Sequence, residues 1–459
     1  VHQSGWTEVV RAGEGAGSIF VWLSGCGQEA AGLSVWSEVR IMAIEPLRLK
    51  FLAGLDNRSR EYALASGAAR ILDNVDVTRD GGLISRKGVR AVLANDSHSL
   101  FSHPNQQFML AVYQGNLIKL AANEGYETLV AGVGRTVYAV LNDAIYWTDG
   151  AKVGQVNANG SVGQWGMNNP PTPVVSAAST GGLYAGTYQV AMTAVLTSGL
   201  ESGCTETVSL EVAEGGGIQV ITPNASGVRF TVYRTPAQGA HGELRAACSV
   251  DPNTTVILGV ATLGKPLESL HAVRPLPGQC LIQHKGRLWC ASGNVVWFTS
   301  ERSPHWLFPN VGYYQFESPV TMLGATEDGI YVGLAARIYY LQGNNPLEMQ
   351  QRPVAVVGAA ALSGGEIPYD LFLGEGAFPS RQCVFYDTEG FLCIGKPGGI
   401  IVRPTKAAYS AGTVYSGAVV YQTQNGLRQL VAGLAQSESP FLAQDVAVAE
   451  VFANGIVLG

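Results

Sequence analysis

A short pattern that recurs along the chain constrains the fold more than any other feature of the sequence. In each copy, apolar and aromatic residues precede a short polar or glycine-containing turn, and an apolar pair that ends in aromatics follows it. Three copies align without gaps, namely Val137 to Trp147, Leu288 to Phe298 and Ile330 to Tyr340, and a looser copy runs from Met109 to Leu120. β-Branched and aromatic residues flanking such a turn are typical of a β-hairpin.

One hairpin cannot bury both of its faces, so the recurrence predicts how the hairpins pack. Repetition of a single hairpin unit is typical of β-propellers, in which each blade packs its aromatics on the next. The alternative is a β-sandwich whose hairpins are similar by coincidence. The best helix signal, Arg58 to Arg70, is short and rich in Ala. We therefore predict an all-β protein with a propeller-like core.

A stretch of different character interrupts the hairpin pattern after the linker Asn168-Asn-Pro-Pro-Thr-Pro173. The spacing of its turns predicts a small inserted sandwich of fibronectin type III kind, with the predicted strands Leu183 to Val195, Glu206 to Val212, Gly217 to Ile221 and Val228 to Tyr233. Met42 opens a segment that looks like an ordinary protein start. The predicted organisation is an N-terminal extension (1–41), the first part of the propeller-like domain (42–169), the sandwich (170–265), the second part of the propeller-like domain (266–400) and a C-terminal β segment (401–459).

Charged residues make up only 14% of the chain, against about 25% in typical soluble proteins. Low charge favours either a multi-subunit assembly, whose interfaces are depleted in charge, or a surface of neutral polar residues. The net charge is −6, and we find no cluster of Lys and Arg that could follow a phosphate backbone. Tight nucleic-acid binding is therefore not expected, although a weakly acidic wall would let DNA slide past.

The cysteines carry neither a Cys-x-x-Cys pair nor a histidine at zinc spacing, and we interpret them as reduced core residues. A cross-strand disulfide, Cys383 to Cys393 or Cys280 to Cys290, is the alternative. Leu23 to Cys26 resembles a bacterial lipobox, but Glu8 and Glu14 lie where positive charge is expected. No run of 18 apolar residues exists, so no membrane span is predicted. The seven cysteines are Cys26, Cys204, Cys248, Cys280, Cys290, Cys383 and Cys393.

No motif predicts a catalytic, cofactor-binding or metal-ligating residue, and no cofactor is expected. Gly259 to Lys265 and Gly390 to Lys396 match the start of a phosphate loop, but Pro266 and Pro397 stand where Ser or Thr must hold magnesium. In Gly199 to Gly203 the serine lies one place too late for a nucleophile elbow. The histidines, which share no ligand spacing, are His2, His98, His103, His241, His271, His284 and His305.

Carboxylates in turns are expected to be solvated only. Those singled out are Glu201, Glu206, Glu327 and Asp328. A pair of carboxylates brought together from distant loops, as in glycoside hydrolases, is not visible in a sequence. The aromatic residues of the hairpin copies are expected to pack blades rather than to bind sugar. These are Tyr138, Tyr146, Trp289, Trp297, Tyr331 and Tyr339.

Two stretches resemble the tail nozzle or tail stabilisation hub proteins of short-tailed bacteriophages. The first is Ala69 to Thr78, with its Asn-Val-Asp, followed by Gly82-Leu-Ile-Ser-Arg-Lys-Gly88, where Lys87 replaces a common proline. The second is Gly286-Arg-Leu-Trp and its continuation to Glu301, with Asp328-Gly-Ile-Tyr-Val-Gly333 and Ile338 to Gly343 behind it. The resemblance covers roughly residues 45 to 345, and the order of the motifs is its main support.

The resemblance implies a virion structural protein of the phage tail that is assembled in the cytoplasm of the bacterial host. It further implies a hexameric ring of this chain with a central DNA channel, docked to portal, adaptor and other tail proteins. DNA would pass without specific binding, and the protein would not be an enzyme. The alternatives are a carbohydrate-binding or carbohydrate-degrading propeller, such as a tail-associated depolymerase, and a lipid-anchored bacterial surface adhesin.

Overall fold

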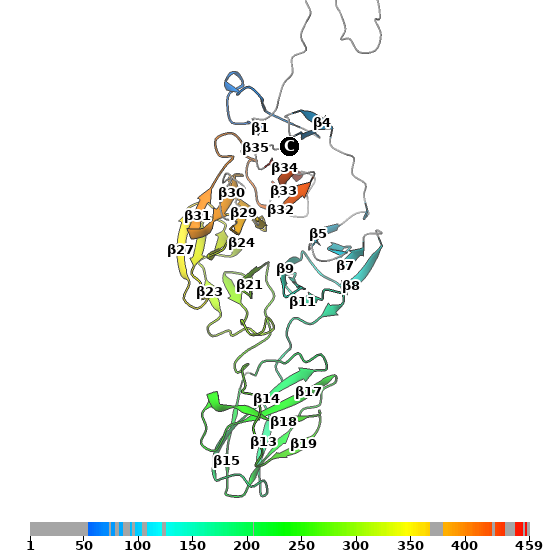
Figure 1. The fold of residues 1–459 in the computed structure, drawn as a ribbon, viewed down its shortest axis with the longest axis vertical. Coiled ribbons are helices and arrows are strands. Elements are labelled where there is room, and N and C mark those ends of the chain that lie inside the picture. Colours follow the sequence, from blue (N-terminus) through cyan, green and yellow to red (C-terminus); the bar gives the residue numbers. More distant parts are fainter. Residues whose placement is uncertain are drawn as a thin grey trace, which may run out of the picture. The chain divides into compact units, whose positions relative to one another are not determined.

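The computed structural model describes residues 54–72, 75–78, 82–85, 92–93, 97–102, 108–121, 125–204, 206–367, 380–424, 427–436, 446–452 and 455–456. Across these ranges the regular structure consists of β-strands and three short 3-10 turns, with no α-helix (Figure 1). The predicted all-β class is confirmed. The N-terminal extension with its lipobox-like segment lies outside the described residues, as do Met42, His2 and His103.

Six sheets of the described chain are four-stranded antiparallel meanders, in which strands that follow one another in sequence pair. We number them as blades 1 to 6. Blade 1 contains β5 (Ser97–Ser102), β6 (Phe108–Tyr113), β7 (Asn116–Ala121) and β8 (Tyr126–Ala131). Blade 2 contains β9 (Val137–Leu141), β10 (Ala144–Thr148), β11 (Val153–Val156) and β12 (Val162–Gly163). Blade 3 contains β20 (Cys280–His284), β21 (Arg287–Ser292), β22 (Val295–Phe298) and β23 (Tyr313–Gln315). Blade 4 contains β24 (Val320–Ala325), β25 (Gly329–Leu334), β26 (Ile338–Gln342) and β27 (Gln350–Ala355). Blade 5 contains β28 (Gly365–Ile367), β29 (Gln382–Tyr386), β30 (Leu392–Lys396) and β31 (Ile400–Val402). Blade 6 contains β32 (Ser416–Gln424), β33 (Leu427–Ala435), β34 (Val446–Phe452) and β35 (Gly455–Ile456).

Consecutive blades share apolar cores. One cluster of buried side chains joins each successive pair, from blades 1 and 2 through to blades 5 and 6. The first strand of blade 3 also lies beside the first strands of blades 2 and 4. Consecutive blades therefore pack face to face and place their first strands together. This arrangement is the propeller-like core that the repeated hairpins predict. That prediction is confirmed.

The hairpin copies place one pair of aromatics in the same register. Tyr138 pairs with Trp147, Trp289 with Phe298, and Tyr331 with Tyr340. The copies do not occupy equivalent places in their blades, however. The copy in blade 2 forms the first and second strands, whereas those in blades 1, 3 and 4 form the second and third. Local sequence therefore specifies the hairpin, and packing decides its place in the blade.

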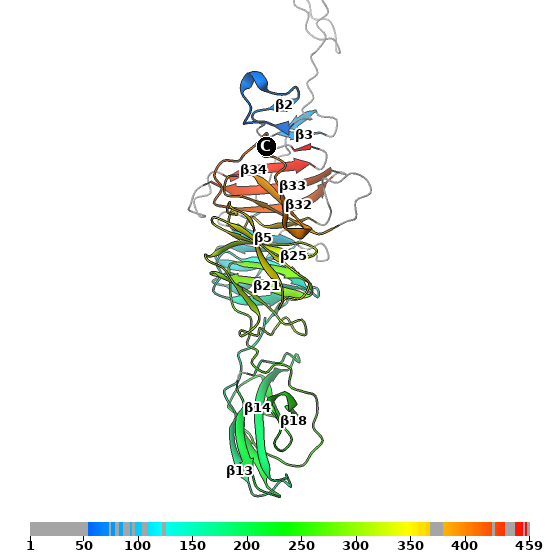
Figure 2. The ribbon, with the colours of Figure 1, turned by 90° about the vertical axis from the view of Figure 1, so that its left-hand side faces the viewer.

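Strands between blades 2 and 3 form two sheets that share one core of buried side chains (Figure 2). One sheet has the order β13-β16-β19 and the other β15-β14-β17-β18. The four strands predicted in this stretch are confirmed; the fibronectin type III kind and the domain boundaries stay predictions. The strands are β13 (Val174–Ala178), β14 (Gly186–Leu196), β15 (Val208–Val212), β16 (Gly217–Ile221), β17 (Val228–Arg234), β18 (Arg245–Val250) and β19 (Thr255–Leu258), with the 3-10 turn η2 (His241–Glu243).

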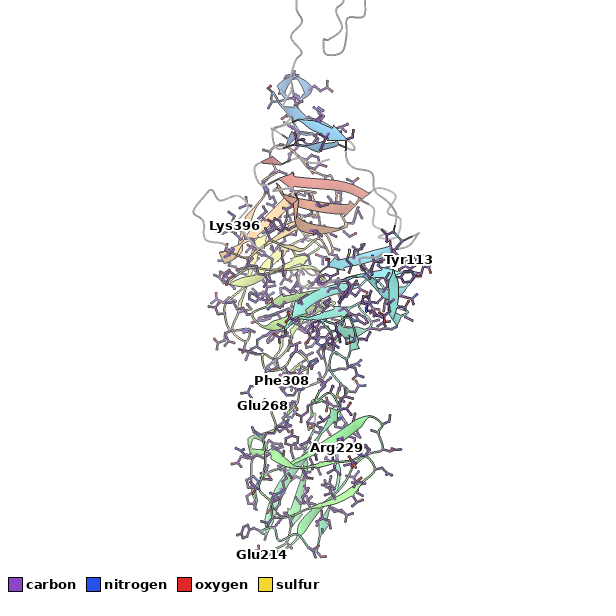
Figure 3. All side chains as sticks on the ribbon, turned by 45° about the vertical axis from the view of Figure 1, so that its right-hand side comes forward. Tyr113, Glu214, Arg229, Glu268, Phe308 and Lys396 are labelled. Atoms are coloured by element: carbon purple, nitrogen blue, oxygen red, sulfur yellow. The ribbon has the colours of Figure 1, made fainter. Side chains whose placement is uncertain are left out.

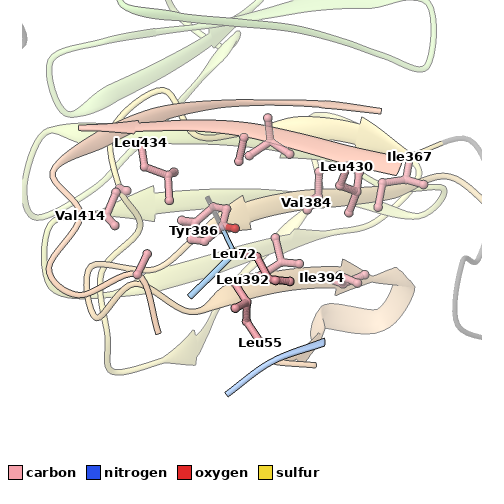
Figure 4. Packing of buried hydrophobic residues seen from close by; sticks show 14 residues of the cluster. Leu55, Leu72, Ile367, Val384, Tyr386, Leu392, Ile394, Val414, Leu430 and Leu434 are labelled. Atoms are coloured by element: carbon pink, nitrogen blue, oxygen red, sulfur yellow. The ribbon is translucent and has the colours of Figure 1, made fainter. Parts of the chain in front are cut away.

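Residues 54–72, the N-terminal hook, pack on blades 5 and 6, which lie far away in sequence. Leu55 and Leu72 enter the core shared by these two blades (Figure 4). Asn57 donates its backbone N–H to Ala408 O at 3.0 Å and its side-chain amide to Ser410 O at 2.8 Å. The hook contains β1 (Gly54–Leu55), which pairs in parallel with β2 (Ala68–Ala69), and the 3-10 turn η1 (Glu61–Ala63); the hairpin β3 (Val75–Val77) and β4 (Leu83–Ser85) follows.

The best helix signal of the sequence, from Arg58 to Arg70, gives only the single turn η1, in line with the all-β prediction. No residue of η1 is buried, and Gly67 adopts a φ of 82°. An Ala-rich composition supplies helix propensity, but a helix this short needs an apolar face to pack on.

The six cysteines in the described part of the chain are all free. Cys280 lies opposite Ala291 and Cys383 opposite Gly395, so neither predicted partner is directly across the ladder. Cys280 and Cys290 belong to different cores on opposite faces of blade 3. The disulfide alternative is therefore wrong, and Cys248 is the one member of this set that is not fully buried.

Candidate functional site

One arginine connects two blades that are not neighbours. Arg381, just before β29 in blade 5, donates to Gln283 O at 2.8 Å and to Gln283 Oε1 at 3.3 Å in blade 3. It also forms an ion pair with Glu366 on β28. Blade 4 lies between blades 3 and 5 in the order of packing, so the guanidinium reaches past it. We call Gln283, Glu366 and Arg381 the cross-blade cluster.

His284 follows Gln283 and is 1% exposed. Its Nε2 has no hydrogen-bond partner among the described residues, and its ring lies 6.4 Å from that of Trp289. Burial lowers the pKa of His284 to about 4, and the nearby charges of Arg381 and Lys285 add to this effect. The imidazole is therefore neutral near pH 7. Its pKa is too low for efficient general acid–base catalysis, which favours values near the working pH.

This buried imidazole predicts a pH dependence of stability. The unfolded chain takes up the proton near the ordinary pKa of 6.5 and the folded chain only near 4, so stability is full above pH 6.5 and falls as the pH drops toward 4. By pH 5 the loss attributable to His284 is about 2 kcal/mol. Denaturant unfolding at pH 7, 6 and 5 should show a shallower pH slope for His284→Gln than for wild type. His241→Gln, at an exposed site, should keep the wild-type slope; equal slopes for all three proteins would contradict the assignment.

A second polar group joins blades 4 and 5. Asp328 accepts a short hydrogen bond from Tyr340 OH and two from Gly398 N–H at 3.0 and 3.2 Å. Gly398 lies in the 3-10 turn η3 (Pro397–Gly399) of blade 5. Tyr331 OH donates across the same joint to Lys396 O at 2.7 Å and Ile400 O at 2.9 Å. The expectation that Asp328 is merely a solvated turn residue is wrong, because its carboxylate orders the neighbouring blade.

A third group lies where the sandwich meets blade 3. Thr193 and Tyr233 donate to Glu201 Oε1 at 2.7 and 2.6 Å, and Lys265 pairs with Oε2. Trp306, from the loop between β22 and β23, donates to Glu201 O at 2.9 Å. Burial alone would raise the pKa of Glu201, but the hydrogen bonds from Lys265, Tyr233 and Thr193 hold it below its usual value. Glu201 is thus a structural anion rather than a solvated one, whereas Glu206 and Glu327 are exposed as expected.

The remaining motif residues take local structural places. Ser202 is 1% exposed; its Oγ accepts from Ala194 N–H at 2.9 Å and donates to Gly203 O at 2.9 Å, so it holds a turn. Residues 259–265 form the loop after β19, and 390–396 run through a turn into β30, followed by η3. Neither stretch opens a helix, which a phosphate loop requires.

Most of the repeated aromatics are buried, as expected for packing residues. Trp289 and Tyr331 are 0% exposed, Tyr146 3% and Tyr339 8%. Trp297 is half-buried and packs on Tyr313, which is 43% exposed. The fully buried rings cannot reach a ligand without opening the blades.

Sequence reasoning missed the cross-blade cluster and an ion pair between the buried Asp387 and the partly exposed Arg403, 2.8 Å apart. Gln283 and Arg381 are 98 residues apart, and no local signal links them. Asp387 does have a signal, since Asp387-Thr-Glu-Gly390 is typical of a turn in which the Asp side chain binds following N–H groups.

Comparison with known proteins assigns the chain to no family. No family model matches it, and no curated protein sequence does. Similar solved structures include the Dos1 propeller, 7% identical with a TM-score of 0.35 over 84% of this chain and 83% of that one. BBS1N in complex with ARL6DN is 9% identical with a TM-score of 0.32 over 76% of this chain and 96% of that one. Hsv2p of Kluyveromyces lactis is 12% identical with a TM-score of 0.23 over 53% of this chain and 58% of that one.

At such identities and TM-scores these likenesses say nothing about what the chain binds. Two further findings concern the site directly. Among the residues that the structure describes, no three or more His, Cys, Asp or Glu side chains are grouped to hold a metal ion. Likewise, no helix there has the length and apolar character needed to cross a membrane.

Proposed function

We propose that the chain is a virion structural protein, a hub or nozzle component of a phage tail that acts without enzymatic activity. The observation that carries the proposal is the ordered sequence resemblance, whose second stretch falls on consecutive blades. Gly286 to Glu301 covers the β21–β22 hairpin of blade 3, and Asp328 to Gly343 covers the β25–β26 hairpin of blade 4. The same motifs that carry the resemblance therefore build the core of the propeller.

In this role the chain forms a ring of copies around a DNA conduit and docks portal, adaptor and other tail proteins, after assembly in the cytoplasm of the bacterial host. The net charge of −6 supports a wall that repels phosphate and lets DNA slide. The three polar groups of the site support a scaffold, because each uses its hydrogen-bonding capacity to join a blade to a blade or to the sandwich.

The proposal predicts assembly of the purified full-length protein. At tens of micromolar, light scattering and negative-stain images should show rings, or the protein should bind purified portal and adaptor proteins encoded beside it. Low surface charge and exposed apolar residues are expected to need such partners. A strictly monomeric protein that captures neither tail protein would count heavily against the assignment, and glycan binding in its place would favour the carbohydrate alternative.

A further inference from the structure

Two chain segments join the sandwich to the propeller-like core. The incoming linker, residues 164–173, connects β12 in blade 2 to β13, and the outgoing linker, residues 259–279, connects β19 to β20 in blade 3. Domains of one chain ordinarily move relative to each other unless the contact between them is extensive. The contacts of these two linkers therefore decide whether the sandwich moves freely.

The incoming linker is anchored in two cores at once. Trp165 is 2% exposed and packs in the core shared by blades 2 and 3. Met167, two positions further along, packs against the apolar cluster around Phe230 in the sandwich. Gly166 between them has a φ of 77°, and a Cβ added to it would lie 2.9 Å from His305 O. One tightly packed glycine thus separates the two anchors.

The outgoing linker is anchored in the same way. Leu270 packs against the sandwich cluster that contains Tyr233. Three positions further along, Val273 exchanges two backbone hydrogen bonds with Leu307 of blade 3, each of 2.8 Å. The chain therefore leaves the sandwich and meets the blade within a few residues, which is too short a distance to act as a flexible linker.

One loop of blade 3, residues 299–312 between β22 and β23, contacts both linkers and the sandwich, and we call it the joint loop. Its Pro304 O accepts from Trp165 Nε1 of the incoming linker at 2.8 Å. Its Arg302 pairs at 2.5 Å with Glu268 of the outgoing linker, which Figure 3 labels. Its Trp306 donates to a backbone carbonyl of the sandwich at 2.9 Å. The joint loop thus ties three segments together.

Backbone segments also touch at the sandwich end of the joint. Gly203 lies in the sandwich loop between β14 and β15, and a Cβ added to it would lie 2.0 Å from Ala272 O of the outgoing linker. Ala272 is 0% exposed, and its O accepts from Asn169 Nδ2 of the incoming linker at 2.7 Å. Because close-packed segments have low compressibility, a displacement of one is transmitted to the other.

We propose that the sandwich is a fixed arm of the propeller-like core, locked by the joint loop, rather than a module that moves on flexible linkers. A fixed arm keeps whatever the sandwich contacts at a constant distance from the blades and transmits its displacement to blades 2 and 3. The inference does not rest on the phage assignment, since it concerns two parts of one chain. A protein that forms no ring leaves the fixed arm testable, and a mobile arm leaves the ring testable.

The first test compares the tumbling of the two parts in the full chain by nuclear magnetic relaxation of backbone amides. A fixed arm predicts one rotational correlation time for the sandwich and the blades. Gly203→Ala should shorten the correlation time of the sandwich relative to the blades, because the new methyl group clashes with Ala272 O. The control Gly242→Ala should keep the wild-type values, since a Cβ there meets nothing within 4 Å.

The second test uses Trp306→Phe, which keeps an aromatic ring and removes one hydrogen bond to the sandwich. Amide hydrogen exchange in both linkers should become about two- to tenfold faster, while the strands of the blades and of the sandwich keep wild-type protection. This comparison decides even where Gly203→Ala does not fold.

Two results would overturn the proposal. One is a wild-type sandwich that tumbles faster than the blades, which would show an arm free to move. The other is linker exchange that is unchanged in Trp306→Phe, which would show that the joint loop does not hold the linkers.

Discussion

Replacing Trp289 by alanine is expected to lower the free energy of unfolding by about 3–5 kcal/mol. The indole is 0% exposed and belongs to the core shared by blades 3 and 4. Its ring lies 4.7 Å from that of Phe298 and 6.3 Å from that of Tyr314. Truncation would leave a cavity in the middle of this stack, which the surrounding strands cannot close without breaking their ladders. Thermal unfolding of the purified variant, or its loss from the soluble fraction, measures the effect.

Trp297→Ala is the matched control, because the two tryptophans share one hairpin. Trp297 is half-buried on the other side of the sheet and packs mainly on exposed Tyr313, so its truncation should cost much less. Should Trp289→Ala keep wild-type stability while abolishing binding on a glycan array, the packing role would be wrong and a carbohydrate function would replace the scaffold.

The second large effect concerns the buried carboxylate of Asp387, whose side chain is 0% exposed. It accepts from Arg403 Nε at 2.8 Å and from the backbone N–H groups of Phe391 at 2.8 Å and Glu389 at 3.2 Å. Asp387→Ala would leave the Arg403 guanidinium without its counter-charge and two backbone donors without an acceptor. Breaking a fully buried pair typically costs about 3–5 kcal/mol, and because Arg403 is 23% exposed we expect a destabilisation at the lower end of that range in denaturant unfolding.

A double-mutant cycle with Arg403→Met separates the pair from its surroundings. The double variant should be more stable than the sum of the two single losses predicts, because it leaves no uncompensated charge. Glu301→Ala is the surface control: Glu301 is 74% exposed in its ion pair with Arg287, and its loss should stay within about 0.5 kcal/mol. Equal costs for Asp387→Ala and Glu301→Ala would contradict the structural role of the buried pair.

The sequence alone predicts those features of the fold that residues close to one another along the chain determine. Alternation of apolar residues and turn chemistry specify each hairpin: Asn142 and Asp143 adopt φ values of 51° and 60°, and Gln114 and Gly115 values of 50° and 70°, as a tight hairpin turn requires. The aromatic partners then fall opposite one another, since the turn sets the register. The Ala-rich stretch from Arg58 to Arg70 forms no α-helix for a related reason, because propensity without an apolar face does not stabilise a helix.

Only the tertiary structure decided how these local units combine. Whether a hairpin forms the first two or the middle two strands of its blade depends on which further strands pair with it, and the copies in blades 2 and 3 differ in this respect. Polar contacts between distant segments have the same origin: Arg381 and Gln283 meet across 98 residues, and Asn57 and Ser410 across 353. Each of these contacts exists only once segments that are remote in sequence have packed.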